Sequence, residues 1–133
     1  MTRAGPHRWP IRVYYEDTDL AGIVYYANYL KFIERARTEW VRDLGVDQGR
    51  LKAEEGIVFA VRRVEADYIQ PAGFDDELVV HTSVEALTGA RLVLKQDVLR
   101  DGVVLFASTV TLVALGGDGR PVRLPDVLRR TLH

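Results

Sequence analysis

Residues 23–45 read IVYYANYLKFIERARTEWVRDLG, and apolar side chains recur in this stretch at the spacing of one helical face. Leu30 and Phe32 widen that face, and Gly45 provides a stop because glycine adopts the left-handed conformation at low cost. The sequence therefore predicts one long amphipathic helix over residues 23–44, whose apolar side packs on a large partner surface. The predicted stripe consists of Tyr25, Tyr29, Ile33, Ala36, Trp40 and Leu44.

The chain on both sides of this helix is rich in β-branched and aromatic residues. Strands are predicted at residues 11–15, 57–69 (as one strand or two), 77–87, 92–100 and 103–115. Asp101-Gly102, between the last two strands, predicts a type I′ hairpin turn. Short helices are expected at residues 47–55 and 125–132. The pattern indicates a single α+β domain over residues 1–133, in which an antiparallel sheet of about five strands wraps around the helix.

The composition narrows the range of functions. The chain has no cysteine, which excludes disulfides, thiolate metal sites and cysteine nucleophiles. Its three histidines are scattered, so we expect neither a metal site nor a cofactor. A net charge of −1 argues against general nucleic-acid binding. No apolar run approaches the ~20 residues of a membrane span, and residues 1–10 do not read as a signal peptide. We therefore expect a soluble cytoplasmic protein.

Three carboxylates lie within four positions at residues 16–19 (Glu-Asp-Thr-Asp), between the first strand and the helix. Free N–H groups in the first turn of a helix carry a partial positive charge, which stabilises a carboxylate or a developing oxyanion. Gly22 lets a ligand approach the backbone because it has no side chain. An acyl carbonyl would then point at the N–H groups near Tyr25 and Tyr26, with Asp19 beside it.

A simpler role explains the same residues. Asp and Thr before a helix are typical N-caps, and on the residues alone capping is the more frequent role. Asp17 and Thr18 are expected to be structural, one as a cap or turn residue and the other through its hydroxyl. Glu34 and Arg37 are a candidate surface ion pair. The residues alone leave both capping and catalysis open for Asp19.

Three segments carry a resemblance to a known family: residues 12–19 (RVYYEDTD), 21–25 (AGIVY) and 32–39 (FIERARTE). Together they resemble the signature of the 4-hydroxybenzoyl-CoA thioesterase superfamily, most closely the Tol–Pal-associated acyl-CoA thioesterases. The likeness continues through residues 59–63, Tyr68 and residues 75–76, and covers nearly the whole chain. It implies the hotdog fold, in which an antiparallel sheet wraps around one long central helix, and it implies acyl-CoA thioester hydrolysis.

The resemblance also implies roles for individual residues. Asp19 would be the catalytic carboxylate, acting as nucleophile or as general base for water. The N–H near Tyr26 would polarise the thioester carbonyl, and Tyr15 matches a further catalytic position. Tyr26 stands where the Tol–Pal-associated branch usually has histidine, so the catalytic set lacks a histidine here. A thiol with a pKa near ~8.5 leaves as thiolate with little need of a general acid. The substrate-binding segment would comprise Gly22, Ile23, Val24 and Tyr25.

The partners that the resemblance implies are an acyl-CoA, with acyl-carrier protein as another source of the thioester, and further copies of the chain. A homodimer or homotetramer is implied, with each active site at a subunit boundary, and an unpaired sheet edge favours such pairing. Arg91, Arg120 and Arg123 are candidates for the coenzyme A phosphates, although each also fits a solvated surface charge. A hotdog dehydratase and a non-catalytic acyl-CoA-binding protein remain as alternatives.

Overall fold

The computed structural model describes residues 5–132; residues 1–4 and 133 of the predicted domain lie outside the described residues. One antiparallel sheet has the strand order β1-β3-β4-β5-β2, and the short strand β6 pairs with β5. The elements in chain order are β1 (His7–Arg12), the 3-10 turn η1 (Tyr15–Asp17), α1 (Asn28–Asp43), α2 (Gln48–Glu55), β2 (Val58–Tyr68), β3 (Glu77–Leu87), β4 (Arg91–Arg100), β5 (Val103–Leu115), β6 (Pro121–Val122) and α3 (Asp126–Leu132).

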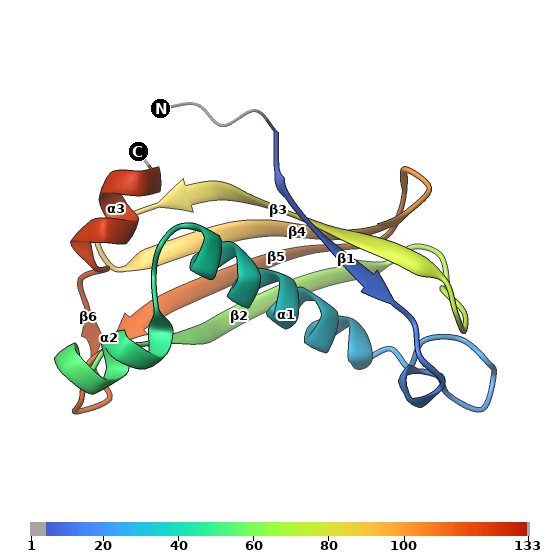
Figure 1. Ribbon diagram of the computed structural model, residues 1–133, viewed down its shortest axis with the longest axis horizontal. Coiled ribbons are helices and arrows are strands. Elements are labelled where there is room, and N and C mark those ends of the chain that lie inside the picture. Colours follow the sequence, from blue (N-terminus) through green and yellow to red (C-terminus); the bar gives the residue numbers. More distant parts are fainter. Residues whose placement is uncertain (1–4, 133) are drawn as a thin grey trace.

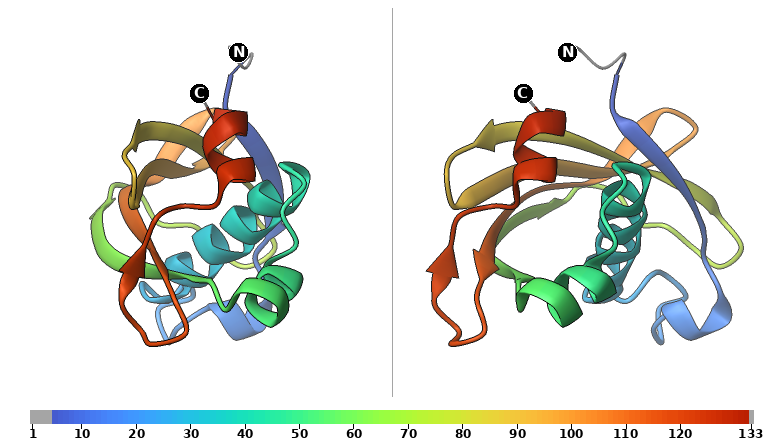
Figure 2. Two further views of the ribbon diagram at one scale, coloured as in Figure 1. Left: turned by 90° about the vertical axis from the view of Figure 1, so that its left-hand side faces the viewer. Right: turned by 60° about the vertical axis from the view of Figure 1, so that its left-hand side comes forward.

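The sheet curls around α1, which crosses one of its faces (Figures 1 and 2). Phe32 and Ile33 of α1 are fully buried in the same core as Val80, Leu94 and Phe106 of the three middle strands. Burial of such large apolar side chains is the main favourable contribution to folding. The predicted α+β hotdog architecture is confirmed.

The prediction that α1 starts at Ile23 is wrong, because the helix begins at Asn28. Residues before it are held in a loop by non-local contacts: Val24 donates its N–H to the Ala72 carbonyl at 2.8 Å. Tyr25 is consequently off the helical stripe and 45% exposed. Leu30, expected to widen the stripe, is exposed as well.

The first strand also differs from its prediction. β1 covers His7–Arg12 rather than residues 11–15, so Tyr15 lies in η1 and not in a strand. Pro10 lies within β1, opposite Val79 of β3. A proline is tolerated there because β1 is an edge strand with a neighbour on one side only. The N–H that proline lacks is therefore not needed for pairing with a second strand.

The remaining elements follow the sequence prediction closely. The bounds of β3 and β5 are as expected, and α2 and α3 fall within the two predicted short helices. Residues 57–69 contain one strand, β2. Asp101 and Gly102 both have positive φ, 51° and 79°, as a type I′ turn requires. The two-residue strand β6 was not predicted. Within residues 5–132, no helix is both long and apolar enough to cross a membrane.

A buried polar network fixes α1 on the sheet. Gln96 of β4 is fully buried, and its amide nitrogen donates to the Ile33 carbonyl of α1 and to the Thr82 hydroxyl, both at 3.0 Å. Its amide oxygen accepts from Arg37 at 2.9 Å, and burial lowers the pKa of Arg37. The expected surface pair is wrong: no ion pair joins Arg37 to Glu34 in the described part of the chain.

Candidate active site

Residues 18–24 form a tight antiparallel loop before α1. Thr18 and Val24 face each other in a β-bridge, and the Asp19 N–H donates to the Ile23 carbonyl at 2.9 Å. The Gly22 N–H donates back to the Asp19 carbonyl at 2.9 Å. Gly22 has φ 81°, a conformation that glycine adopts without strain, and a Cβ there would meet nothing within 4 Å. Glycine is therefore favoured here by the positive φ of the turn and not by a close contact with a neighbouring residue.

Asp19 lies exposed where the turn of this loop begins. One carboxylate oxygen, Oδ1, accepts from the Ala21 N–H at 2.9 Å. The other oxygen has no hydrogen-bond partner, and no cation pairs with the carboxylate, among residues 5–132. The turn thus holds the Asp19 side chain by one oxygen and leaves the other free for a ligand.

Asp17, two residues earlier, has the opposite surroundings. It is 5% exposed, and its carboxylate accepts from the Tyr14 N–H at 2.8 Å and from the Asn28 side-chain amide at 3.0 Å. The Thr18 hydroxyl donates to the Tyr15 carbonyl at 2.7 Å. Both residues are structural, as expected. Asp17 ties the loop to the first residue of α1, so of the two aspartates only Asp19 faces solvent.

The start of α1 has no side-chain cap. Its N-cap residue is Ala27, and the preceding aspartates and threonine do not bond to its N–H groups. The capping alternative is therefore wrong for this helix. The Tyr25 N–H is occupied by the Asp17 carbonyl at 2.8 Å. The Tyr26 and Ala27 N–H groups, in contrast, donate to no other residue that the structure describes. Two adjacent unpaired donors consequently precede α1.

A second loop, residues 69–76, supports the first. Gly73 forms a β-bridge with Ile23, and the Asp76 carboxylate accepts from the Gly73 N–H at 2.8 Å and from Arg100 at 2.7 Å. The Gly73 N–H is the main cause that lowers the pKa of Asp76, with Arg100 acting in the same direction and burial partly opposing it. Asp76 and Arg100 therefore fix Gly73, the residue that bonds to the Asp19 loop through Ile23.

Aromatic side chains fill the space behind the two loops. Tyr29 of α1 stacks on Phe106 of β5, with ring centroids 4.9 Å apart and an angle of 5° between the planes. Burial raises the pKa of Tyr29, and the nearby backbone of Ala72 partly opposes this. Tyr26 and Tyr68 lie further out and are 62% and 50% exposed. An acyl group would therefore meet rings at the loop end of α1.

The similarities of the chain to known proteins can be set beside this geometry. The thioesterase superfamily matches residues 21–107, which begin two residues after Asp19 and include the rest of its loop, α1 and the strands β2, β3 and β4. The chain belongs to the thioesterase superfamily. The acyl-CoA thioesterase YbgC of Haemophilus influenzae is 40% identical over 126 residues, which cover 94% of this chain and 93% of that protein.

Solved structures agree with this family. A probable thioesterase from Bartonella henselae has a TM-score of 0.87 and 36% identity, covering 90% of this chain and 99% of its own. A 4-hydroxybenzoyl-CoA thioesterase in complex with 4-hydroxybenzoyl-CoA superposes with a TM-score of 0.91. Its identity is 21%, over 98% of this chain and 100% of that chain, so it supports the fold alone. The predicted thioesterase family and the expectation of an enzyme are confirmed.

The three arginines expected at coenzyme A lie far from Asp19 in this thioesterase. Arg91 begins β4 and Arg123 lies beside Gly89, in the turn after β3. Arg120 precedes β6 and pairs with Asp118 at 3.9 Å. These arginines lie by the Leu87 end of β3, whereas the Asp19 loop is anchored near its Glu77 end. The two ends of this 11-residue strand are about 33 Å apart. One subunit therefore does not bring the arginines and the carboxylate together.

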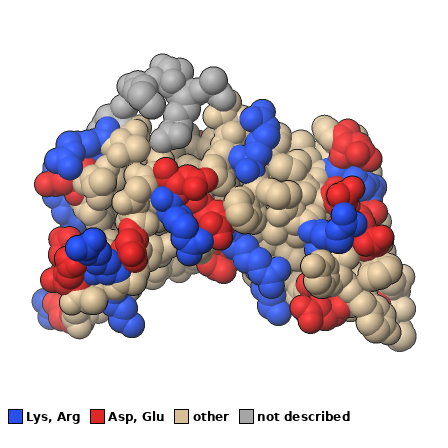
Figure 3. Space-filling model, viewed as in Figure 1, with Lys and Arg blue, Asp and Glu red and all other residues tan. Residues whose placement is uncertain are grey.

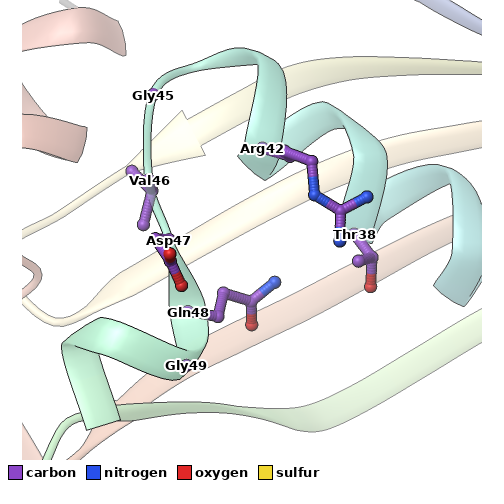
Figure 4. Close-up of a pocket in the computed structure, with 7 residues that line it drawn as sticks. All are labelled: Thr38, Arg42, Gly45, Val46, Asp47, Gln48 and Gly49. Atoms are coloured by element: carbon purple, nitrogen blue, oxygen red, sulfur yellow. The ribbon is translucent and has the colours of Figure 1, made fainter. Parts of the chain in front are cut away.

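The pocket drawn in Figure 4 also lies away from the Asp19 loop. It has a volume of about 440 Å³ and is formed where α1 ends and α2 begins, with Thr38, Arg42 and Gln48 among its lining residues. Arg42 is already paired with Glu39 at 2.6 Å. Figure 3 shows basic and acidic side chains interspersed on the face that carries α1, with no large area of one sign. Neither feature marks a second charged site in the thioesterase.

Asp76→Asn is expected to lower the free energy of unfolding by about 1–2 kcal/mol at pH 7, because a charged hydrogen-bond acceptor is lost. The folded-state pKa of Asp76 lies below the ordinary 3.8, so the unfolded chain takes up the proton first as pH falls. The wild-type advantage is therefore fully present above about pH 3.8 and disappears as pH falls through the folded-state pKa. Urea unfolding from pH 2.5 to about pH 7 measures the difference; a gap that stays constant with pH contradicts the prediction.

Proposed function

We propose that this thioesterase hydrolyses acyl-CoA thioesters with Asp19 as its catalytic carboxylate. The observation that carries the proposal is the exposed Asp19 carboxylate, fixed by one oxygen, on a loop that leads to two unpaired backbone donors. The name of the Haemophilus influenzae relative supports acyl-CoA as the substrate class. Tyr15 is 83% exposed in η1, just before this loop, and is proposed as a further site residue.

The chemistry needs few groups. Asp19 either attacks the thioester carbonyl, giving a mixed anhydride, or takes a proton from the attacking water. In both routes negative charge develops on the carbonyl oxygen, and the unpaired N–H groups at Tyr26 and Ala27 stabilise it. The carbon–sulfur bond then breaks and the thiol, with a pKa near ~8.5, leaves as thiolate. Water supplies the oxygen atom that hydrolysis adds, either to the acid directly or by replacing an oxygen that Asp19 has given to the acid. No oxidation state changes, so the reaction needs no redox partner or cofactor.

The two routes differ in the fate of the water oxygen. If Asp19 is the nucleophile, water hydrolyses the anhydride and its attack on the aspartyl carbon transfers solvent oxygen to the enzyme. A single turnover in oxygen-18 water would then label the Asp19 carboxylate, which mass spectrometry of the peptide detects. If Asp19 is a general base, the label appears in the released acid alone.

Thiol release from a panel of acyl-CoAs tests the function directly. We expect free thiol to appear with short, long and aromatic acyl groups at different rates, and the acyl-carrier-protein thioesters of the same acids form a parallel series. Binding without thiol release across the whole panel would instead support an acyl-CoA-binding protein. Conversion of a hydroxyacyl thioester to its enoyl product would support a dehydratase.

We infer that the site is completed by a second copy of the chain. β2 is an edge strand of 11 residues with no proline, and its outer edge pairs with no other strand within residues 5–132. Exposed apolar side chains lie in the Asp19 loop and in the loop of residues 69–76 that bridges to it: Leu20, Ile69 and Phe74 are each more than half exposed. Exposed edges and apolar surfaces of this kind favour association. Pairing through β2 would also bring the partner's distant arginine end closer to the Asp19 loop for coenzyme A.

The charges on β2 suggest how two copies align. In antiparallel pairing about a two-fold axis through Val64, Arg63 lies opposite Glu65 of the partner subunit, and the pair occurs twice. Arg63→Glu would place like charges opposite each other and raise the dimer Kd about tenfold. Adding Glu65→Lys would restore opposite charges and most of the affinity. Sedimentation of the three proteins measures this; a fully active single chain contradicts the shared site.

A further inference from the structure

The hydroxyl of Tyr68 reaches the backbone that precedes α1. Tyr68 is the last residue of β2, and its hydroxyl donates to the Tyr26 carbonyl at 2.9 Å. The Tyr68 ring packs edge-on against Tyr29 and Phe106, with centroids 5.7 Å and 5.1 Å away. Those two rings are buried and stacked on each other. The core thus sets the position of the Tyr68 hydroxyl, although half of the side chain is exposed.

This hydrogen bond constrains the two unpaired donors. A peptide unit is planar and trans, so its C=O and N–H point in opposite directions. Holding the Tyr26 carbonyl therefore fixes the direction of the Ala27 N–H, which belongs to the same unit. It also restricts rotation between this unit and the preceding one, which carries the Tyr26 N–H. A hydrogen bond at the carbonyl polarises the unit and makes its N–H a stronger donor.

We propose that Tyr68 is a positioning residue for catalysis, which aims the Tyr26 and Ala27 N–H groups at the oxyanion of the thioester. This inference rests on the proposed function, because those groups must first bind the carbonyl oxygen. Tyr68 does not itself touch the reacting atoms. It acts through the peptide between Tyr26 and Ala27, and pre-aligned donors cost no reorganisation when charge develops.

The chemistry of the side chain suits this role. Burial, and then the neighbouring Tyr26 hydroxyl, raise the pKa of Tyr68 above the ordinary 10.0. Its hydroxyl therefore stays protonated, and able to donate, throughout the neutral range. A phenylalanine would retain the ring contacts with Tyr29 and Phe106 and remove only the donor.

Tyr68→Phe tests the proposal against Tyr14→Phe. We expect Tyr68→Phe to lower kcat about tenfold, less than the hundredfold or more that follows loss of a whole oxyanion donor. KM and the unfolding midpoint should stay within experimental error, because ground-state contacts and ring packing persist. Tyr14 is 61% exposed and its hydroxyl bonds to no described residue. Tyr14→Phe removes the same group and should leave kcat unchanged.

The outcomes separate this inference from the proposed function. A wild type that releases no thiol overturns the function and the inference together. An active wild type whose kcat changes less than twofold in Tyr68→Phe overturns the role of Tyr68 alone. Equal losses in Tyr68→Phe and Tyr14→Phe, or a rise in KM without a fall in kcat, also overturn it.

A fluorinated tyrosine at position 68 provides a second test with almost no change in shape. Two or three ring fluorines together lower the hydroxyl pKa toward the neutral range, and above that pKa the ionised oxygen can no longer donate to the Tyr26 carbonyl. We expect kcat of this protein to fall as pH rises through that pKa, while the wild type shows no such step. A pH profile identical to that of the wild type contradicts the proposal even if Tyr68→Phe folds poorly.

Discussion

Asp19→Asn is expected to lower kcat for acyl-CoA hydrolysis by about a thousandfold, because asparagine can act neither as nucleophile nor as general base. The amide oxygen of asparagine can still accept from the Ala21 N–H, which now bonds to Asp19 at 2.9 Å. The loop should therefore keep its shape and acyl-CoA should still bind. Thiol release under saturating substrate, with binding measured by calorimetry, tests both statements.

Asp101→Asn is the matched control for this change. Asp101 lies in the turn between β4 and β5 with φ 51°, a conformation that asparagine also tolerates. The control makes the same chemical substitution at an exposed position and should keep the wild-type rate. If Asp19→Asn stays within about threefold of the control while both proteins remain folded, the catalytic assignment of Asp19 is wrong.

Phe32→Ala is expected to cause a large loss of stability, about 3–5 kcal/mol, because a fully buried ring leaves a cavity in a close-packed core. Phe32 is 0% exposed in the centre of the apolar face of α1. Urea unfolding at one fixed protein concentration measures the difference, since association of the chains would make stability depend on concentration.

Leu30→Ala is the control on the same helix. Leu30 is two residues away and 43% exposed, so its truncation should cost less than about 1 kcal/mol. The two variants together test which face of α1 meets the sheet. Similar losses in both, or a larger loss for Leu30→Ala, would mean that α1 is rotated relative to the structure described above.

Local signals in the sequence were enough for most of the fold. The periodic spacing from Tyr29 to Trp40 and the Asp101-Gly102 turn depend on short-range physics, and both lie where predicted. The start of α1 was misplaced because Ile23 and Val24 continue the apolar pattern. The helix begins only at Asn28 because Ile23 and Val24 instead bond to residues 72–73, almost 50 positions later in the chain. Such non-local contacts override helical periodicity.

The candidate site shows the same division. The cluster of acids was visible in the sequence, but only burial distinguishes Asp17, bonded to Asn28, from the exposed Asp19. The roles of Asp76 and Tyr68 were missed, since each acts on a loop distant in sequence. The one available signal was that both residues fall in the segments that resemble the family. That resemblance marked them without indicating what they bond to.

The strand order has a consequence for how the site forms during folding. β3, β4 and β5 are consecutive in the chain and pair with their neighbours through short turns, whereas β1 pairs with β3 across about 70 residues. Closing short loops costs the least entropy, so the three-stranded meander is the part of the sheet that assembles first. The Asp19 loop comes soon after β1 in the chain, and it bonds to the segment that joins β2 to β3. It can therefore become ordered only after both outer strands have docked, which makes thioesterase activity a late event in folding.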